Sequence, residues 1–242
     1  MLISQFQVVG RDLCARGLVS SHSGNLSIRL GERLCITHRG SMLSRLEEHD
    51  LVETGINKND RFTPLASTEL AVHRSIYKRT PASAVVHAHP AYAVALSFSE
   101  QEIIPCDVEG SMILSKVPVL GWDTNVKPGE LAGEIAEALM AHKIVLVHGH
   151  GSFAAAQLLE EAYHYTTTLE ESCRLLSAQN SEDRVPLTFQ PLNPGQNQQV
   201  IGSSKKISSA WSVPVLNMLA CTSEDIWRFY PLSRQNKGAE VP

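Results

Sequence analysis

The feature that most constrains the fold of this chain is a short, uninterrupted apolar segment, Ile144–Val147. Such a segment is typical of a strand that is covered on both faces. A second apolar segment, Ser83–His89, ends at Pro90, which lacks the backbone N–H that continues a strand or helix. Sequences with helical spacing alternate with these strands, so the pattern predicts a layered α/β domain.

Helical and hairpin patterns fill most of the remaining sequence up to Asn180. Near the start, Phe6, Val9 and Leu13 share one helical face. Two β-rich segments, 25–30 and 33–37, flank Gly31-Glu32 and predict a hairpin. We expect further helices at 69–79, 91–98, 127–142 and 154–178, a strand at 117–121, and a charged, turn-prone connection at 47–64.

The composition changes after Asn180. Residues 186–210 are rich in Gln, Asn, Ser, Pro and Gly, a mixture typical of a linker. We therefore expect one domain over residues 1–180 and, over residues 181–242, a polar linker that ends in a short docking segment.

Composition excludes several classes of partner. With 43% hydrophobic residues in 242, the chain can bury one sizeable core. The net charge of −4 gives no reason to expect a nucleic-acid partner. No segment approaches the roughly 18 uncharged apolar residues that span a membrane. The five cysteines are scattered and form no CxxC pair, which favours a reducing compartment and a cytoplasmic location.

Two histidine groups indicate a metal site. His87 and His89 lie two residues apart on a predicted strand, so their side chains share a face about 6.5 to 7 Å apart. Alone, such a pair is as often structural as metal-binding. His148 and His150 follow the second strand among glycines. Three imidazoles with an open fourth position are typical of catalytic zinc, but the spacing does not choose between His148 and His150.

Other polar segments could bind an anion. Ser23–Ser27, Thr37–Ser41 and Ser67-Thr68 are small, polar segments at element ends, where exposed N–H groups can hold phosphate. Each is also an ordinary turn sequence. Glu69 follows the last of them, and its position alone favours a helix-terminal glutamate with no other task.

Five motifs occur in one order: SGNLSIR, ITHRG, STE, HAHP and VHGHG. As a set they resemble the class II aldolase/adducin family over roughly residues 5–180. The resemblance implies a three-layer α/β/α domain with a central, mainly antiparallel sheet. It also implies a ring-shaped homotetramer with sites at the subunit boundaries.

The resemblance assigns roles to individual residues. It makes Glu69 the acid/base and a ligand of the resting metal, and it makes His87, His89 and His150 the zinc ligands, so that His150 is selected over His148. Another divalent transition metal is an alternative to zinc. The residues assigned to the substrate phosphate are Gly24, Asn25, Gly40, Ser67 and Thr68, with Arg39 in the same loop.

The sequence departs from the family pattern at two places. The second hairpin usually has Thr-Pro-Ser/Thr-Gly, whereas here Arg39 precedes the glycine and can bind a phosphate or a carboxylate bidentately. Aldolases of the family carry a tyrosine acid after the histidine pair. The comparable segment, 104–110, offers Glu109 or Asp107 as the acid.

Three functions follow from the resemblance. The first is retro-aldol cleavage of a phosphorylated sugar or related hydroxy-ketone through a zinc-stabilised enediolate, in carbohydrate metabolism. The second keeps the metal and acts as an epimerase, dehydratase or decarboxylase on a sugar phosphate or sugar acid. The third is a non-catalytic, adducin-like interaction module, which the retained histidines and Glu69 argue against.

Overall fold

The structure, a computed structural model, describes residues 2–122 and 128–180, and within them an eight-stranded sheet with the order β3-β2-β1-β4-β8-β7-β6-β5. The strands are β1 (Asn25–Leu30), β2 (Arg33–Thr37), β3 (Leu51–Gly55), β4 (Ala84–Ala88), β5 (Glu102–Ile103), β6 (Val117–Leu120), β7 (Ile144–Val147) and β8 (Gly151–Ala156). Neighbours pair antiparallel, except that β6 and β7 are parallel. The predicted α/β fold with a mainly antiparallel sheet is confirmed.

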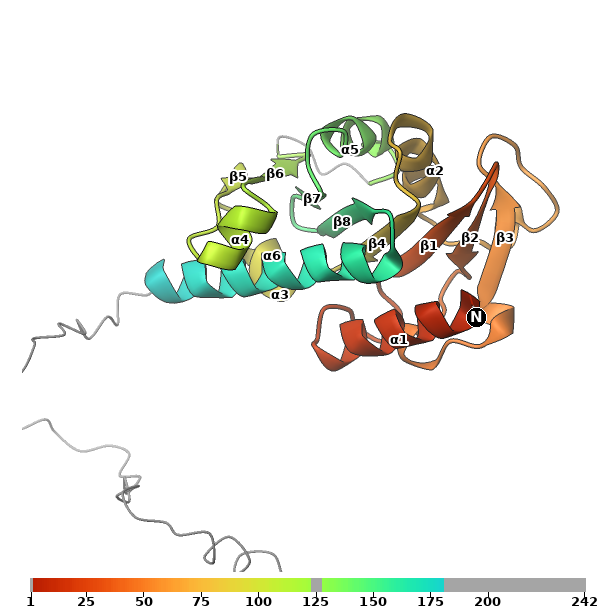
Figure 1. The fold of residues 1–242 in the computed structure, drawn as a ribbon, viewed down its shortest axis with the longest axis horizontal. Helices are drawn as coiled ribbons and strands as arrows, with labels where there is room; N and C mark the ends of the chain where they lie inside the picture. Colours follow the sequence, from red (N-terminus) through yellow and green to blue (C-terminus); the bar gives the residue numbers. More distant parts are fainter. Residues whose placement is uncertain (1, 123–127, 181–242) are drawn as a thin grey trace, which may run out of the picture. The chain divides into compact units, whose positions relative to one another are not determined.

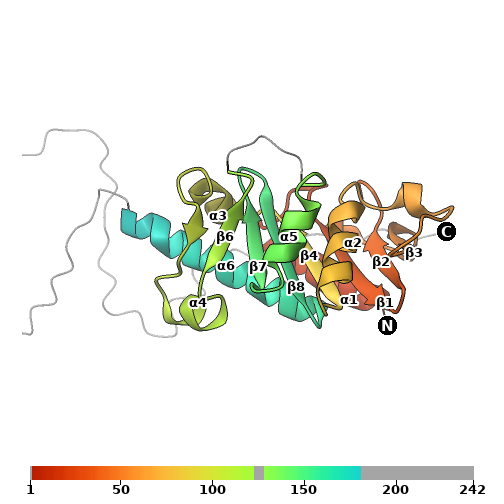
Figure 2. The same cartoon turned by 90° about the horizontal axis from the view of Figure 1, so that it is seen from above.

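Helices cover both faces of the sheet. They are α1 (Leu2–Ala15), α2 (Leu70–Arg79), α3 (Ala91–Leu96), α4 (Val108–Ile113), α5 (Ala132–Ala138) and α6 (Leu159–Asn180), with the 3-10 turns η1 (Leu43–Arg45), η2 (Glu48–Asp50) and η3 (Thr63–Leu65). Helices α2 and α5 pack together over one face, and α6 covers the other with α1, α3 and α4 against it (Figures 1 and 2). The domain therefore has the predicted three layers.

Strand β4 contributes to both cores because its side chains alternate between the two faces. Val86 and Ala88 belong to the cluster that also contains α1 and α6, whereas Val85 belongs to the cluster under α2 and α5. His87 has the same parity as Val85. The alternation therefore directs His87 towards the side of the sheet on which α2 begins.

The prediction of a helix over residues 154–178 is wrong at its start. Gly151–Ala156 is β8, which lies between β4 and β7 and pairs with both, and α6 begins only at Leu159. Three consecutive alanines favour a helix by only a few tenths of a kcal/mol each. The backbone hydrogen bonds to two neighbouring strands and the burial of Phe153 outweigh that preference.

Other differences concern segments with weak patterns. Residues 47–64 do not form only a connection, because β3 lies within them and pairs with β2 at the edge of the sheet. The helix expected at 127–142 is described only as Ala132–Ala138. Neither β5 nor α4 was predicted. The linker and docking segment predicted for 181–242 lie outside the described residues.

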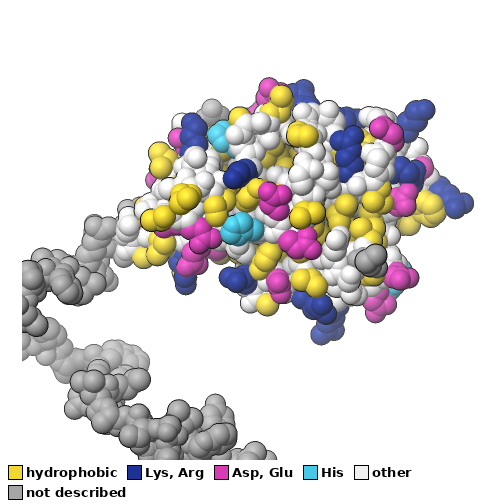
Figure 3. All heavy atoms as spheres, viewed as in Figure 1, with side chains coloured by type: hydrophobic (Ala, Val, Ile, Leu, Met, Phe, Trp, Pro, Cys, Tyr) yellow, Lys and Arg dark blue, Asp and Glu magenta, His cyan; other side chains and the backbone are white. Residues whose placement is uncertain are grey.

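Three further observations concern the helices, the surface and the cysteines. Within the described ranges, no helix combines the length and the apolar character that crossing a membrane requires. Acidic and basic side chains are interspersed over the face shown in Figure 3. The four cysteines in the described part of the chain are free thiols.

A close helix contact gives a test of the fold. Gly10 lies where α1 meets η1, and a Cβ at this position would collide with the carbonyl oxygen of Leu43. At Gly133, in α5, a Cβ would meet no atom within 4 Å from other described parts of the chain. We expect Gly10→Ala to lower the free energy of unfolding by about 1–3 kcal/mol because of this overlap. Gly133→Ala should raise it by up to about 1 kcal/mol through helix propensity.

Denaturant unfolding of the two variants measures both changes. Because the substitution and the type of element are the same, the opposite signs isolate the contact with η1. Equal stabilisation by both alanines would contradict the close approach of α1 to η1.

Candidate functional site

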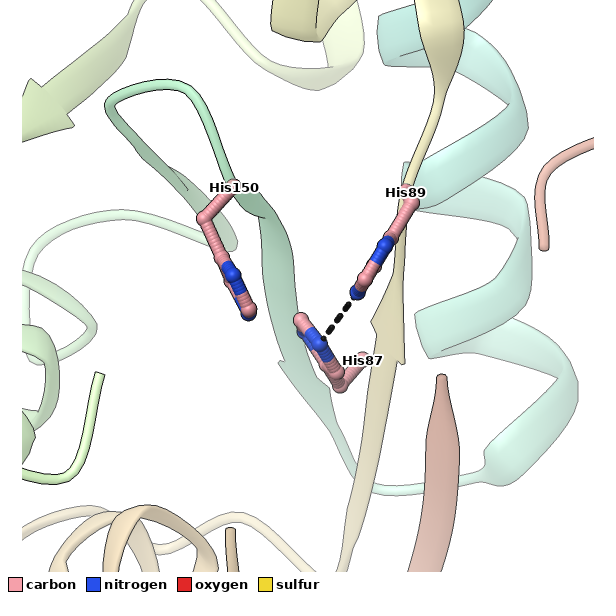
Figure 4. Close-up of side chains that lie close together, drawn as sticks. All are labelled: His87, His89 and His150. Carbon is pink, nitrogen blue, oxygen red and sulfur yellow. Dashed lines mark hydrogen bonds between the residues drawn. The ribbon is translucent and has the colours of Figure 1, made fainter. Parts of the chain in front are cut away.

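Three histidines from two distant segments meet at one end of the central strands. His87 lies on β4, His89 just beyond its end, and His150 in the turn between β7 and β8. Their ligand nitrogens lie within 4.8 Å of one another. Figure 4 shows the three rings directed towards a shared space. The register of β4 with β8, in which His87 faces Phe153, brings the turn beside the histidine pair.

The structure separates His148 from His150. The sequence predicted that this segment runs into a helix, but residues 148–150 form the tight turn of a β-hairpin in which Val147 pairs with Gly151. The His148 ring packs instead at 5.4 Å from the Phe98 ring and 5.0 Å from the Trp122 ring, centroid to centroid. The His150 ring stacks on His87 at 5.1 Å.

Gly151 allows the hairpin to approach the histidine pair. A Cβ at this position would lie 2.4 Å from the carbonyl oxygen of Ala88 and 2.8 Å from a ring carbon of His89. Any side chain would therefore push β8 away from the end of β4. The glycine after His150 is a packing requirement of this site.

Glu69 lies against the histidines from the other side. It occupies the position before the first turn of α2. Its Oε1 is 3.0 Å from Nε2 of His150, and its Oε2 is 3.0 Å from Nε2 of His87. Asn25 Nδ2 donates to Oε2 at 2.7 Å. Burial raises the pKa of Glu69, but the hydrogen bonds from the His150 ring and from Asn25 lower it, and the pKa of Glu69 is about 2.

The proton on His87 can be assigned from its partners. Burial lowers the pKa of His87 to about 3, so the ring is neutral near pH 7. Its Nδ1 lies 2.9 Å from the carbonyl oxygen of Ser152, which can only accept, so the proton is on Nδ1. Nε2 therefore presents a lone pair to Glu69 Oε2 and to His89 Nε2, 2.9 Å away. A cation is the partner that satisfies two facing acceptors.

The donor set fits a divalent transition metal. Three imidazole nitrogens and one carboxylate oxygen are ligands that zinc accepts, and cobalt, manganese and iron accept them too. Tetrahedral zinc holds nitrogens at about 2.0–2.1 Å, which places them roughly 3.4 Å apart. The histidine nitrogens lie within 4.8 Å of one another, so small rotations of the rings bring them to that spacing.

A cavity of about 220 Å³ opens beside the cluster. Besides Glu69 and the three histidines, its walls contain His22, Ser23, Gly24, Asn25, His38, Arg39, Gly40, Ser41, Ser67 and Thr68. All six residues that the sequence assigned to substrate binding are among them. His22 and His38 were given no role, although His22 directly precedes one of the polar segments and His38 lies within another.

Part of the cavity wall is suited to an anion. The backbone N–H groups of Gly24, Gly40 and Thr68 donate to no acceptor within residues 2–122 and 128–180. Arg39 is exposed and forms no ion pair with any described residue. Free N–H groups beside an unpaired guanidinium are ligands for phosphate or carboxylate.

The predicted acid residue is not at this cavity. Glu109 lies exposed on α4 and lines a different cavity, with Arg16 and Arg174. Asp107 has a structural task, since it accepts hydrogen bonds from Gly110 N and from Ser172 Oγ at the start of α4. Within one chain the structure therefore does not bring Glu109 to the histidines.

Sequence reasoning missed the second partner of Asn25. His73 lies on the face of α2 that also carries the buried residues Leu70 and Ile76, and it is itself fully buried. However, its Nε2 lies 2.5 Å from Asn25 Oδ1, and its Nδ1 lies 2.6 Å from Ser27 Oγ. The available signal was a polar residue on an otherwise apolar helix face, because a buried imidazole needs hydrogen-bond partners.

Comparison with known proteins finds a matching family and solved structures with a similar fold. Residues 4–177 match the family described as the Class II Aldolase and Adducin N-terminal domain. The L-fuculose-1-phosphate aldolase of Thermus thermophilus is 42% identical, with a TM-score of 0.69 over 73% of this chain and 92% of that protein.

Two curated relatives carry different activities. The L-fuculose phosphate aldolase of Methanocaldococcus jannaschii is 28% identical over 71% of this chain and 93% of its own length. The 3-oxo-tetronate 4-phosphate decarboxylase of Haemophilus influenzae is 30% identical over 69% of this chain and 82% of its own length. The similarity therefore shows the family of this chain, but it does not choose between these reactions.

The two histidines of the hairpin turn give a matched test of the metal site. We expect His150→Ala to lower the affinity for Zn²⁺ by at least about a hundredfold, because it removes one of three imidazole ligands. His148→Ala should leave the affinity within about threefold of the parent, because its ring faces Phe98 and Trp122. Calorimetric titration of the metal-free proteins measures both, and equal affinities for the two variants would refute this ligand set.

Proposed function

The chain belongs to the class II aldolase and adducin family, and we propose that it is a zinc-dependent lyase that cleaves a carbon–carbon bond in a phosphorylated sugar or related hydroxy-ketone. The observation that carries the proposal is one cavity lined by two chemically distinct sets of groups. One set is Glu69 with three histidines, and the other is Arg39 with backbone N–H groups that have no acceptor among the described residues. Relatives named as fuculose phosphate aldolases support the reaction class.

His87, His89 and His150 are the residues that would hold the metal. Neutral imidazoles leave a divalent ion its full charge, and such an ion supplies Lewis-acid polarisation of a carbonyl group. The Nδ1–H of His87 donates to the carbonyl oxygen of Ser152, which leaves Nε2 unprotonated and free to act as a ligand. Zinc is our proposal for the ion, because it accepts three histidines with an open position.

The anion-binding residues orient the substrate. The loops that carry Gly24, Gly40 and Thr68 line the same cavity as Glu69. A phosphate held there fixes the distance from the phosphate to the reacting carbons, and it removes rotational freedom that the reaction would otherwise lose at the transition state. Arg39 adds a second, charged contact at the cavity wall.

Glu69 is the residue that we assign to the proton transfer at carbon. In retro-aldol cleavage the hydroxyl of the carbon that leaves as an aldehyde loses its proton, and the electrons of the broken carbon–carbon bond pass to the carbon beside the carbonyl. That carbon then gains a proton. The proton lost equals the proton gained, so no other reactant is needed. The Glu69 oxygens lie 3.0 Å from His87 Nε2 and His150 Nε2, so the carboxylate is beside the residues that would hold the metal.

Decarboxylation is a second candidate that one observation favours. Arg39 stands at the cavity without a partner among the described residues and could hold a carboxylate of a phosphorylated sugar acid. The decarboxylase relative from Haemophilus influenzae is 30% identical to this chain. In that reaction the carboxyl group leaves as CO₂, and Glu69 would again handle the proton at the carbon left behind.

The role predicted for Glu109 depends on assembly. Because Glu109 does not line the cavity of its own chain, it could act there as the acid only if another subunit brought its α4 close to the cavity. We propose the homotetramer implied by the family resemblance as the assembly that does so. The exposed apolar residues Val108 and Met112 on the same helix are compatible with such a contact.

Replacing the carboxylate tests the assignment of Glu69. We expect Glu69→Gln to lower kcat by about 10²–10⁴-fold, because the proton transfer is lost. The variant should still bind Zn²⁺, because the three imidazoles remain. Turnover of a sugar-phosphate panel and metal analysis of the purified protein measure these effects. Glu134→Gln, the same change at an exposed position of α5, is the control. Full activity of the parent after removal of all metal would contradict the proposal.

Replacing Arg39 tests which anion the cavity binds. We expect Arg39→Ala to raise KM for a phosphorylated substrate about tenfold, because a charged hydrogen bond is lost, with little change in kcat. Arg45→Ala, an exposed arginine that does not line the cavity, is the control. Product NMR during the same assays separates an aldehyde product from CO₂. An unchanged KM for Arg39→Ala would show that Arg39 does not contact the substrate.

A further inference from the structure

A continuous series of hydrogen bonds runs from the buried core to the carboxylate of Glu69. Tyr77 OH lies 2.7 Å from Ser27 Oγ, and Ser27 Oγ lies 2.6 Å from Nδ1 of His73. Nε2 of His73 lies 2.5 Å from Asn25 Oδ1, and Asn25 Nδ2 lies 2.7 Å from Glu69 Oε2. Tyr77, Ser27 and His73 are each at most 1% exposed.

The direction of each hydrogen bond follows from the end at Glu69. A carboxylate only accepts, so the amide nitrogen of Asn25 must face Glu69 and its carbonyl oxygen must face His73. A carbonyl oxygen also only accepts, so His73 donates from Nε2. Burial lowers the pKa of His73 to about 4, and the neutral ring has one proton. Nδ1 is therefore an acceptor, and the Ser27 hydroxyl donates to it.

The alternative orientation of Asn25 shows what the series achieves. A rotated amide would place Oδ1 against Glu69 Oε2, two acceptors at hydrogen-bond distance. It would also place the NH₂ group against the N–H of His73, two donors in a buried environment. Buried polar groups without a partner are strongly disfavoured. With the His73 proton on Nε2, the Asn25 amide therefore has only one favourable orientation, in which Oδ1 faces His73 and Nδ2 faces Glu69.

We propose that His73 is a positioning residue that acts through Asn25: it holds the amide in the orientation whose N–H keeps Glu69 directed at His87 and His150. The structural part of this proposal concerns the tautomer and the amide. Its catalytic consequence rests on the proposed function of Glu69. A charged carboxylate between two histidine nitrogens needs such a restraint, because small rotations would move its oxygens from one to the other.

A merely structural role makes different predictions. His73 also packs edge-on to the Phe153 ring, with centroids 6.3 Å apart, so its removal costs core packing whatever Asn25 does. Packing loss would lower stability and would act independently of Asn25. If His73 positions Asn25, replacing His73 lowers kcat. The same replacement then lowers kcat no further in a protein that already lacks the Asn25 side chain.

A double-mutant cycle on the metal-loaded full chain separates the two roles. We expect His73→Leu and Asn25→Ala each to lower kcat about tenfold or more, and the double variant to be no slower than Asn25→Ala alone. His73→Gln should recover most of the activity, because the glutamine amide can donate from a position close to Nε2. Val72→Ala, a packing change on the same helix, should lower stability while kcat stays unchanged. Additive losses in the cycle would overturn the proposal.

A second measurement does not depend on activity and tests the proposal even where His73→Leu fails to fold. In the metal-free parent labelled with ¹⁵N-histidine, we expect the His73 signals to show a proton on Nε2, with the signal assigned by its absence in His73→Gln. If the enzyme is active and the His73 proton is found on Nδ1, the proposal is overturned. If the Nε2 tautomer is found but no substrate is turned over, the proposed function fails and the positioning of Glu69 by His73 stands.

Discussion

The antiparallel pairing of β4 with β8 is the contact on which the candidate site depends. It places the last residues of β4, which carry a histidine pair, beside the turn that carries His150. The turn can come this close because residue 151 has no side chain. The two segments are about sixty residues apart in the chain, and the hydrogen bonds between the strands hold their separation to within a narrow range.

Electrostatics then gives the cluster its chemical character. The buried imidazole of His87 stays neutral because ionisation in this position is unfavourable, and its one proton is used by the carbonyl of Ser152. Its other nitrogen faces a carboxylate that Asn25 helps to keep ionised. The same burial that keeps His87 neutral therefore leaves a lone pair facing a negative charge, which is the arrangement that a divalent cation stabilises.

The cavity explains why one scaffold can serve several reactions. The metal end would activate a carbonyl group in the same way for an aldol cleavage or a decarboxylation, because both produce negative charge beside a carbonyl. The difference lies in what the rest of the cavity wall binds and in which group supplies a proton. In this chain those variable elements are Arg39, on the cavity wall, and the residue that serves as acid. Neither is set by the strands that hold the histidines.

The sequence by itself determined the features that depend on local spacing: the side shared by His87 and His89, the first hairpin, and the layered α/β class. Only the tertiary structure decided that 151–156 is a strand, that Glu109 lies elsewhere, and that His73 forms a hydrogen bond with Asn25. Spacing left His148 and His150 open, the family resemblance selected His150, and the structure places its ring against His87. The reason is physical. Side-chain direction repeats with a short period along one element, whereas contacts between elements depend on strand order and on burial, which overrides weak local preferences such as that of three alanines for a helix.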